Sequence, residues 1–455
     1  MTEKNFKNFF KNKKITVIGL GLLGGALGDI AFLAKHGAEI TVTDLKSEKE
    51  LRFSMQKLKK FSNIKYVLGR HELEDFKNRD MILQPGNVPA DSPYLSEAKK
   101  NKIPIYVSES LFAEYAPPVT IVGVTGTRGK SMTTALIYEI LKHNEKYIKY
   151  PSTSLRAKKP SVFLGGNVRN TSTLALLEKV KAGDVVVMEL DSWALHGMGD
   201  IKRSPEIAVF TSFMPDHMNF YGSTSSPQVA MKKYFADKAN IFKFQKKDDV
   251  LIIRPEMKKL IKKEDVKSRL VIVKSSDFQT ENRECAIEVA KQFKIPDSKI
   301  SKALKNFKGL EGRLQYLKTV RGVKIYNDNN ATTPEATMAG IEALSISFPG
   351  DKKIILICGG ADKKLPLDDF VKVLDKYCKA VIMIPGTGTD RLVSSGEVLV
   401  SSMQTKDLEG AMKNGMKLAK KGDFLLFSPA FASFGQFNNE YERNDLFMKI
   451  IKNLK

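Results

Sequence analysis

The hydrophobic positions of the N-terminal third fall into short runs separated by longer stretches with helical spacing. The apolar runs are typical of buried strands and lie at Ile15–Ile18, Ile40–Thr43, Lys65–Leu68, Met81–Leu83 and Ile105–Val107. Strands that alternate with helical segments indicate βαβ units, in which successive strands run parallel. This part of the chain therefore predicts an open parallel sheet covered by helices.

The same alternation begins twice more along the chain. A second set of apolar runs starts at Val119–Val124, and a third set starts near Gly309. The pair Pro117 and Pro118 is typical of a linker, because proline restricts its own backbone and that of the preceding residue. We therefore expect three α/β domains, with boundaries at residues 1–117, 118–308 and 309–455.

Composition excludes several classes of protein. Of 455 residues, 42% are hydrophobic and 27% are charged, which excludes a disordered chain, a collagen-like chain and a small disulfide scaffold. Cys285, Cys358 and Cys378 lack the spacing of a zinc site or a redox pair, so reduced thiols in a cytoplasmic protein are expected. The net charge of +23 favours anionic partners. The lysine-rich runs lack the aromatic residues that stack on single strands, so no specific nucleic-acid partner is expected.

One apolar stretch imitates a membrane anchor. A basic N-terminus precedes Ile15–Ala34, which is largely apolar. This stretch contains five glycines and Asp29, whose charge is costly in lipid. It is better interpreted as a strand, a glycine turn and a helix, and no transmembrane segment is expected.

The strongest local signal is a glycine-rich loop between a strand and a helix. The sequence GVTGTRGKS covers Gly123–Ser131, after the apolar run TIVGV and before the helical pattern SMTTALIYEILK. Glycines let backbone N–H groups face phosphate oxygens, and the helix N-terminus adds partial positive charge. Lys130 is expected to reach the β- and γ-phosphates, and Ser131 to bind Mg²⁺. The strict motif is not met, because Val124 stands where its first glycine would be.

The segment TGTRGKS resembles the ATP loop of the Mur ligase family, ATP-dependent amide ligases that build the peptide of bacterial cell-wall precursors. Arg128 stands where the family usually has asparagine. The resemblance implies an α/β protein with a Rossmann-like N-terminal domain, a central P-loop ATPase-type domain and a Rossmann-like C-terminal domain. It also implies ATP and Mg²⁺ as cofactors. The ATP-binding residues implied by the loop are Gly126, Thr127, Arg128, Gly129, Lys130, Ser131 and Met132.

Further motifs follow the loop in the order that the family shows. Leu164–Asn167 resembles a Gly-Asn turn, and Glu189 follows an apolar strand. His217 belongs to an Asp-His pair, and Lys238 to a YxxxK element whose lysine is commonly carbamylated. The resemblance implies that Ser131, Glu189, His217 and Lys238 bind the metal. Oxygen ligands are those that Mg²⁺ prefers. Taken without their order, Glu189 could be a surface carboxylate and His217 a structural residue.

The third domain carries further resemblances to ATP contacts of the family. Arg313 lies in a turn similar to the family's GLPHRxE, and Asp328 in an element similar to NDSKATN, with Asn330 in place of its lysine. Asn282 fits the adenine-side motif HNxxN, although Cys285 replaces its second asparagine. Lys130, His217, Lys238 and Arg313 are the residues to which the resemblance assigns catalytic roles.

The first domain begins with a dinucleotide fingerprint. Gly19, Gly21 and Gly24 form GxGxxG, and Asp44 follows at a strand end, which taken alone suggests NAD binding. Beside a Mur-type ATP loop, the same residues instead resemble the family's uridine-nucleotide domain. The residues then expected to bind the UDP substrate are Gly21, Leu22, Leu23, Asp44, Leu45, Gly86 and Asn167.

The C-terminal motifs select among members of the family. Ser428–Phe437 resembles the SPACASxDxF element of the family's D-glutamate-adding enzymes, and Gly359–Lys364 resembles their GGxxK loop. The residues expected to bind the amino acid are Thr332, Lys363, Lys364, Ser433 and Phe434, with the choice between the two lysines open.

The resemblance implies a monomeric cytoplasmic enzyme with UDP-N-acetylmuramoyl-L-alanine and D-glutamate as substrates. Two alternatives stay open. One is a ligase of the same superfamily for another amino acid, or one similar to folylpolyglutamate synthase. The other is a non-catalytic nucleotide-binding protein that uses its basic surface.

Overall fold

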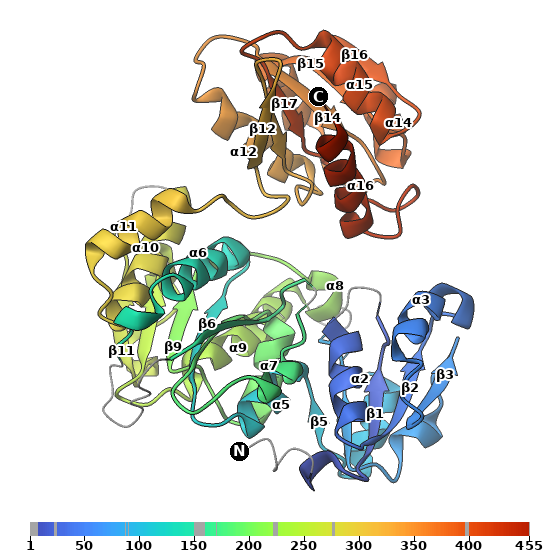
Figure 1. Ribbon diagram of the computed structural model, residues 1–455, viewed down its shortest axis with the longest axis vertical. Helices are drawn as coiled ribbons and strands as arrows, with labels where there is room; N and C mark the ends of the chain where they lie inside the picture. Colours follow the sequence, from blue (N-terminus) through green and yellow to red (C-terminus); the bar gives the residue numbers. More distant parts are fainter. Residues whose placement is uncertain are drawn as a thin grey trace. The chain divides into compact units, whose positions relative to one another are not determined.

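The computed structural model describes residues 8–21, 25–86, 88–89, 91–149, 160–169, 171–221, 226–274, 278–395 and 400–454. The chain forms two compact units, Met1–Phe307 and Lys308–Lys455. The first unit contains two sheets and the second unit contains one, and helices flank each sheet (Figure 1). Within the described ranges, no helix combines the length and apolarity needed to cross a membrane.

The first sheet lies at the start of the first unit. Its strands are ordered β3-β2-β1-β4-β5, and each neighbouring pair is parallel. The turn after β1 and the end of β2 therefore lie at the same edge of the sheet. The elements are β1 (Lys14–Ile18), α2 (Gly25–Lys35), β2 (Glu39–Asp44), α3 (Glu48–Leu58), β3 (Ile64–Leu68), η1 (Leu73–Phe76), β4 (Met81–Leu83), α4 (Pro93–Lys100), β5 (Ile105–Tyr106) and α5 (Ser108–Tyr115).

The second sheet completes the first unit and is also parallel. Its order is β11-β10-β9-β6-β8-β7, so the first strand in the chain, β6, lies inside the sheet. The chain passes from β6 to β7 and β8 on one side and to β9, β10 and β11 on the other. Open α/β sheets bind ligands at the carboxyl end of such a switch point. The elements are β6 (Thr120–Thr125), α6 (Lys130–Lys142), η2 (Glu145–Tyr147), β7 (Val162–Gly166), η3 (Leu174–Glu178), β8 (Val185–Glu189), α7 (Ser192–Asp200), β9 (Ile207–Phe210), α8 (Met218–Tyr221), α9 (Pro227–Lys243), β10 (Val250–Ile253), η4 (Pro255–Lys259), η5 (Lys263–Asp265), β11 (Arg269–Ile272), α10 (Phe278–Gln292) and α11 (Asp297–Asn306).

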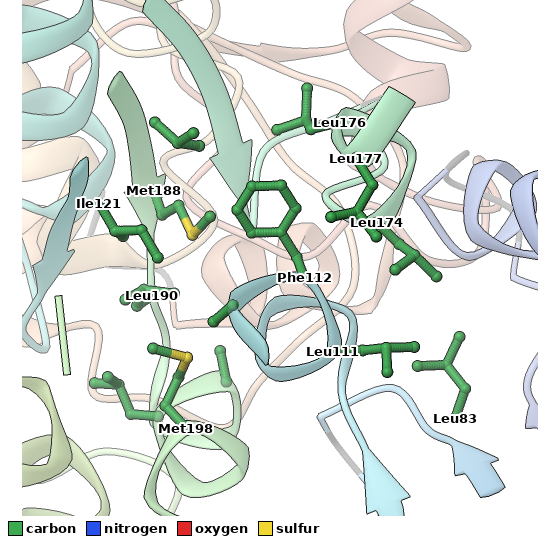
Figure 2. Packing of buried hydrophobic residues seen from close by; sticks show 14 of the residues in the cluster. Leu83, Leu111, Phe112, Ile121, Leu174, Leu176, Leu177, Met188, Leu190 and Met198 are labelled. Atoms are coloured by element: carbon green, nitrogen blue, oxygen red, sulfur yellow. The ribbon is translucent and has the colours of Figure 1, made fainter. Parts of the chain in front are cut away.

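One hydrophobic cluster joins the two sheets of the first unit. Leu111 and Phe112 on α5 are fully buried, and they belong to the same cluster as Leu174 on η3 and Met188 on β8. Figure 2 shows the Phe112 ring among side chains from η3 and β8. Because apolar side chains of both parts fill one core, the first two sheets form a single unit.

The second unit contains a mixed sheet of order β12-β13-β17-β14-β15-β16. Only β12 pairs antiparallel, with β13, and the other strands are parallel. The loops after β13, β14 and β17 therefore meet at one edge. The elements are β12 (Gln315–Val320), β13 (Val323–Asn327), α12 (Pro334–Ser345), β14 (Ile354–Cys358), α13 (Asp368–Tyr377), β15 (Cys378–Met383), α14 (Thr387–Ser394), β16 (Ser402–Gln404), α15 (Leu408–Leu418), β17 (Phe424–Phe427) and α16 (Glu440–Asn453).

The α/β class with parallel sheets is confirmed, and one local prediction is wrong. Leu164–Asn167 was predicted as a turn, whereas Val162–Gly166 forms β7 and only Asn167 follows the strand. Its backbone pairs with β8 along the whole length, which outweighs the weak strand preference of two glycines. Cys285, Cys358 and Cys378 are free and buried, as expected for reduced thiols.

Candidate active site

The phosphate loop follows β6 directly, at the carboxyl end of the sheet. All six residues of β6 are buried, and α6 begins at Lys130, with Gly129 as its N-cap. Gly126 has φ +148°, and a Cβ atom there would lie 2.0 Å from Thr211 Oγ1. Only glycine fits this position. The backbone N–H of Thr127 donates to the carbonyl oxygen of Ser212 at 2.8 Å, which fixes the loop on the segment after β9.

Two lysines converge on one carbonyl of this loop. Lys130 Nζ donates to the carbonyl oxygens of Gly126 and Thr127, at 3.0 Å each. Lys238 Nζ, from α9, donates to the same Gly126 oxygen at 2.9 Å. The Lys238 side chain is buried. Burial, together with the positive charge of Lys130, lowers the pKa of Lys238 to about 7. The Lys238 amine is therefore readily neutral although it lies beside Lys130.

A hydroxyl and a carboxylate meet beside the loop. Ser131 Oγ donates to Glu189 Oε1 at 3.1 Å. Glu189 is the last residue of β8 and is buried. The backbone N–H of Asn167 donates to the Glu189 carbonyl oxygen at 2.8 Å, so the end of β7 also borders this point. The structure thus places Lys130, Ser131, Glu189 and Lys238 around the first turn of α6.

His217 lies in an aromatic cluster next to these groups. Its backbone has a positive φ of +54°, which is uncommon for a residue other than glycine. Its backbone N–H donates to Asp216 Oδ1 at 2.9 Å. Its ring lies 4.7 Å from the Trp193 ring and 6.0 Å from the Tyr234 ring, measured between centroids. The Tyr234 hydroxyl lies 3.4 Å from Thr127 Oγ1 in the loop. Tyr234 therefore links the histidine cluster to the loop.

The donors around Ser131 and Glu189 fit a magnesium ion. A hydroxyl and a buried carboxylate are hard oxygen ligands, which leave the remaining positions to phosphate and water. In the described ranges, no group of three or more His, Cys, Asp or Glu side chains forms a metal cage by itself. Lys238 fits the set only when its amine has been converted to an oxygen ligand.

Three of the predicted UDP-site residues, Gly21, Asp44 and Leu45, lie at the carboxyl edge of the first sheet. Asp44 ends β2, and its carboxylate accepts the backbone N–H groups of Leu20 and Lys46, at 2.9 Å each. It therefore ties the glycine turn after β1 to its own strand end. The carbonyl oxygen of Gly21 accepts a hydrogen bond from Ser54 Oγ at 2.9 Å, and Leu45 is exposed.

Other predicted UDP-site residues connect this edge to the histidine cluster. A Cβ atom at Gly86 would lie 2.4 Å from Trp193 Cβ, so the Gly86 turn packs directly on the tryptophan that contacts His217. Leu22 and Leu23 lie outside the described residues.

The second unit brings its predicted amino-acid residues together. Lys363 Nζ donates to Thr332 Oγ1 at 3.0 Å. Backbone hydrogen bonds between Ala361 and Ala432 join the Lys363 loop to the loop of Ser433 and Phe434. Ser433 is buried and Phe434 is 63% exposed. These loops follow β14 and β17, so the motifs from distant parts of the sequence share one edge of the sheet.

Lys364 and Asp328 have different surroundings in the same unit. Lys364 has φ +58°, and its backbone N–H donates to Asp362 Oδ1 at 2.8 Å. The Asp328 carboxylate is buried, and it accepts hydrogen bonds from the Leu314 backbone and from Ser428 Oγ. Burial raises the pKa of Asp328 to about 6. Arg313, on the turn before β12, is exposed.

Sequence reasoning missed residues that the fold places at the loop. Trp193 packs on His217, and the buried Arg254 donates to Asn282 Oδ1 at 2.6 Å. A sequence signal existed for both. Trp193 is the only tryptophan of the chain and follows Glu189 closely, while Arg254 directly follows the apolar run VLII.

Comparison with known proteins identifies the class of each part. Three family descriptions match in order: the Mur ligase MurD-like N-terminal domain at residues 13–107, the Mur ligase middle domain at 124–309, and the Mur ligase glutamate ligase domain at 312–431. A UDP-N-acetylmuramoylalanine–D-glutamate ligase of Borreliella afzelii (strain PKo) is 33% identical, over 97% of this chain and 98% of the relative. The chain therefore belongs to the Mur ligase family.

Solved structures share the fold over nearly the full length. The UDP-N-acetylmuramate-alanine ligase of Thermotoga maritima superposes with a TM-score of 0.59 and 17% identity, covering 97% of this chain and 100% of that one. The MurF ligase of Thermotoga maritima in complex with ADP gives a TM-score of 0.54 and 16% identity, covering 98% and 96%. At these identities the likeness is one of fold.

Proposed function

We propose that the chain is an ATP-dependent amide ligase that joins D-glutamate to UDP-N-acetylmuramoyl-L-alanine in the synthesis of peptidoglycan precursors. The observation that carries the proposal is the contact between Ser131 and Glu189 at the first turn of α6, beside the Lys130 loop. The full-length similarity to a relative named for D-glutamate addition supports the choice of amino acid.

The loop supplies the ATP site in this proposal. Residues 126–132, with Asn282, bind the nucleotide, and Lys130 exchanges its carbonyl contacts for the β- and γ-phosphates. The γ-phosphoryl group passes to the alanine carboxylate and forms an acyl phosphate. The amine of D-glutamate then attacks the acyl carbon, the amide bond forms, an amine proton is lost, and phosphate leaves. Such transfer depends mainly on positioning and on neutralising charge. Arg313 and Asp328 are the ATP contacts that the second unit contributes.

Ser131, Glu189 and His217 would hold Mg²⁺, together with Lys238 if its amine is converted to a carbamate. The ion neutralises charge on the phosphate oxygens when it is bound. Lys238 fits this role because its amine is neutral in a large fraction of molecules near pH 7. A neutral amine can attack CO₂, forming an N–C bond and releasing one proton, and the product offers anionic oxygens as ligands.

The two substrates are assigned to separate sets of residues. Gly21, Asp44, Leu45, Gly86 and Asn167 are the proposed UDP-substrate residues. Thr332, Lys363, Ser433 and Phe434 are the proposed D-glutamate residues, with the Lys363 ammonium pairing with a carboxylate. We also propose that the enzyme acts as a monomer, and that it acts in the cytoplasm, where its nucleotide substrates are found.

The direct test is phosphate release from ATP with Mg²⁺ and UDP-N-acetylmuramoyl-L-alanine, with and without D-glutamate. Release should require D-glutamate and should not occur with L-glutamate, L-alanine or meso-diaminopimelate. Turnover with another amino acid and not with D-glutamate would indicate a ligase of the same superfamily for that amino acid. Turnover with a pteroate substrate would favour a folylpolyglutamate synthase. Salt-sensitive DNA binding without turnover on any substrate would favour the non-catalytic alternative.

A further inference from the structure

A fully buried arginine lies beneath the phosphate loop and has no role in the reaction described above. Arg254 follows β10, and its side chain has no exposed surface. A buried guanidinium is costly unless it is paired. Its Nη2 donates to Asn282 Oδ1 at 2.6 Å, and its Nη1 lies 3.2 Å from Glu281 Oε2. These contacts fasten the end of β10 to α10.

The same guanidinium touches the last glycine of the loop. A Cβ atom at Gly129 would lie 2.7 Å from Arg254 Nη2 and 2.8 Å from Asn282 Oδ1. Gly129 has φ +87° and caps α6. The turn that aims the helix N-terminus therefore rests on the Arg254–Asn282 pair.

Asn282 is held on its oxygen side by two donors. Thr133 Oγ1, one turn into α6, donates to Asn282 Oδ1 at 2.8 Å, in addition to Arg254. A carbonyl oxygen has two lone pairs, so these donors fix which way the carboxamide faces. The orientation of the Asn282 carboxamide is therefore set by donors from α6 and from the residue that follows β10. The network joins α6, the loop and α10.

The residues that depart from the family motif contact this arginine. Within the pattern HNxxN, Glu281 stands at the histidine and Cys285 at the second asparagine. Glu281 pairs with Arg254, and the buried Cys285 thiol lies against the same guanidinium. Both residues therefore belong to the surroundings of the Arg254 guanidinium that holds Asn282.

We propose that Arg254 is a positioning residue for the nucleotide, which orients the Asn282 carboxamide and supports the Gly129 turn so that both are preorganised for ATP. The proposal rests on the proposed function, because the nucleotide is the ATP of that reaction. Preorganisation lowers the cost of ordering the site on binding. Loss of Arg254 should therefore weaken nucleotide binding and leave the other substrates unaffected.

The test compares Arg254→Met, Arg254→Lys and Asn282→Ala in the full chain. The dissociation constant of ADP with Mg²⁺ is measured by calorimetry, and KM is measured for ATP, UDP-N-acetylmuramoyl-L-alanine and D-glutamate. We expect Arg254→Met to raise the ADP dissociation constant and the KM for ATP by about ten-fold, with the other KM values within about two-fold. Arg254→Lys keeps the charge but loses the forked geometry of the guanidinium. We expect it to raise the ADP dissociation constant and the KM for ATP by about three- to ten-fold.

A double variant and a matched control separate positioning from folding. Arg254→Met combined with Asn282→Ala should bind ADP no more than about two-fold more weakly than Asn282→Ala alone, because Arg254 acts on the carboxamide and on the Gly129 turn through its pair with Asn282. Arg269→Met removes an exposed arginine at the start of neighbouring β11 and should leave ADP binding unchanged. Circular dichroism and melting temperature report the fold, and Arg254→Lys carries the test if the methionine variant does not fold.

The outcomes that overturn the proposal are distinct from those that overturn the ligase assignment. Unchanged ADP affinity in a folded Arg254 variant, or additive effects in the double variant, would show a merely structural arginine. A wild-type chain that binds ADP but does not ligate D-glutamate rejects the proposed function and leaves the role of Arg254 intact. A wild-type chain that binds no ADP rejects both.

Discussion

Lys130 and Lys238 share the Gly126 carbonyl oxygen, and their charges affect each other. Burial and the neighbouring Lys130 cation lower the pKa of Lys238 to about 7. Lys130 is less buried and keeps contact with the outer carbonyl of Thr127. We propose that these two chemically identical side chains have different tasks, Lys130 as a cation for phosphate and Lys238 as an amine that can be modified.

Lys130→Ala should abolish most ADP formation. The side chain supplies the charge nearest to the transferred phosphoryl group, and loss of one such group typically costs about 10²- to 10³-fold in rate. The measurement is ADP release with all substrates present. Lys142→Ala, at the other end of α6 and paired with Glu145, is the control. Full activity in Lys130→Ala would remove the phosphate-loop assignment.

Lys363 and Lys364 should differ in their effect on D-glutamate use. Lys363 Nζ reaches Thr332, and its pKa is lowered by partial burial, whereas Lys364 holds the turn through its backbone. We expect Lys363→Met to raise the KM for D-glutamate by about ten-fold or more and Lys364→Met by less than about three-fold, as for loss of one charge-assisted hydrogen bond. Initial rates over a D-glutamate series decide the matter, and the reverse order would contradict the assignment of Lys363.

At the scale of elements, the unit β6–loop–α6 positions the site. A fully buried strand fixes where the loop starts, and Gly126 and Gly129 provide the backbone conformations that turn it into a helix. The segment after β9 then holds the loop from outside through Ser212. The loop is therefore held in this conformation by contacts within the protein.

Gly126→Ala should destabilise the fold and weaken nucleotide binding. Left-handed backbone costs about 1–2 kcal/mol for a residue with a Cβ atom, and the displaced Thr211 hydroxyl adds to it. Gly69→Ala is the control, since Gly69 also has a positive φ of +77° but no neighbour within 4 Å of its Cβ position. Urea unfolding should show the larger loss for Gly126→Ala. Equal losses would mean that the Thr211 contact is unimportant.

Most parallel strands could be predicted, because buried strands are continuous apolar runs. The sequence patterns missed β7, β12 and β16, for physical reasons. β16 is a short edge strand whose residues are mostly exposed, and β12 is an antiparallel edge strand with only Val320 buried. β7 ends in two glycines. None of these presents the apolar run that identifies a central strand.

The candidate site was predictable where residues follow one another in a motif. The loop from Gly126 to Ser131 is local, so its composition alone indicates phosphate binding. Trp193 and Arg254 reach the site only through the packing of α7 and β10. Their partners lie far away in sequence, so no spacing rule could find them. The choice of Lys363 over Lys364 likewise needed the backbone conformation.

At the scale of the whole first unit, buried carboxylates lie where its two sheets join. Asp29 on α2 accepts a hydrogen bond from Ser172 Oγ at 2.5 Å, and Glu109 on α5 accepts one from Thr173 Oγ1 at 3.2 Å. Burial raises the pKa of Asp29 to about 6 and, with the nearby Asp191, that of Glu109 to about 7. Both carboxyl groups therefore keep their protons to a higher pH in the folded chain than in the unfolded chain.

The free energy of unfolding should fall as the pH rises from about 5 to 8. The unfolded chain releases these protons near pH 4, whereas the folded chain keeps them up to pH 6–7, so raising the pH from 5 to 8 favours unfolding by roughly 1–3 kcal/mol per group. Glu109→Gln should remove the part of this pH dependence that comes from Glu109 and should raise the free energy of unfolding at pH 8. Urea unfolding at pH 5.5 and 8 measures both. Equal pH dependence in wild type and Glu109→Gln would contradict the role of Glu109.

The shared core has a practical consequence for anyone who cuts this protein into pieces. A fragment that stops at residue 117 loses the partners of Leu111 and Phe112, each of which contributes about 1.5–3 kcal/mol by burial. Such a fragment should precipitate or behave as a loosely packed chain when expressed. A fragment that stops at Phe307 keeps every one of these contacts and should stay in solution as a monodisperse particle. The first 117 residues are therefore not expected to fold stably without the second sheet.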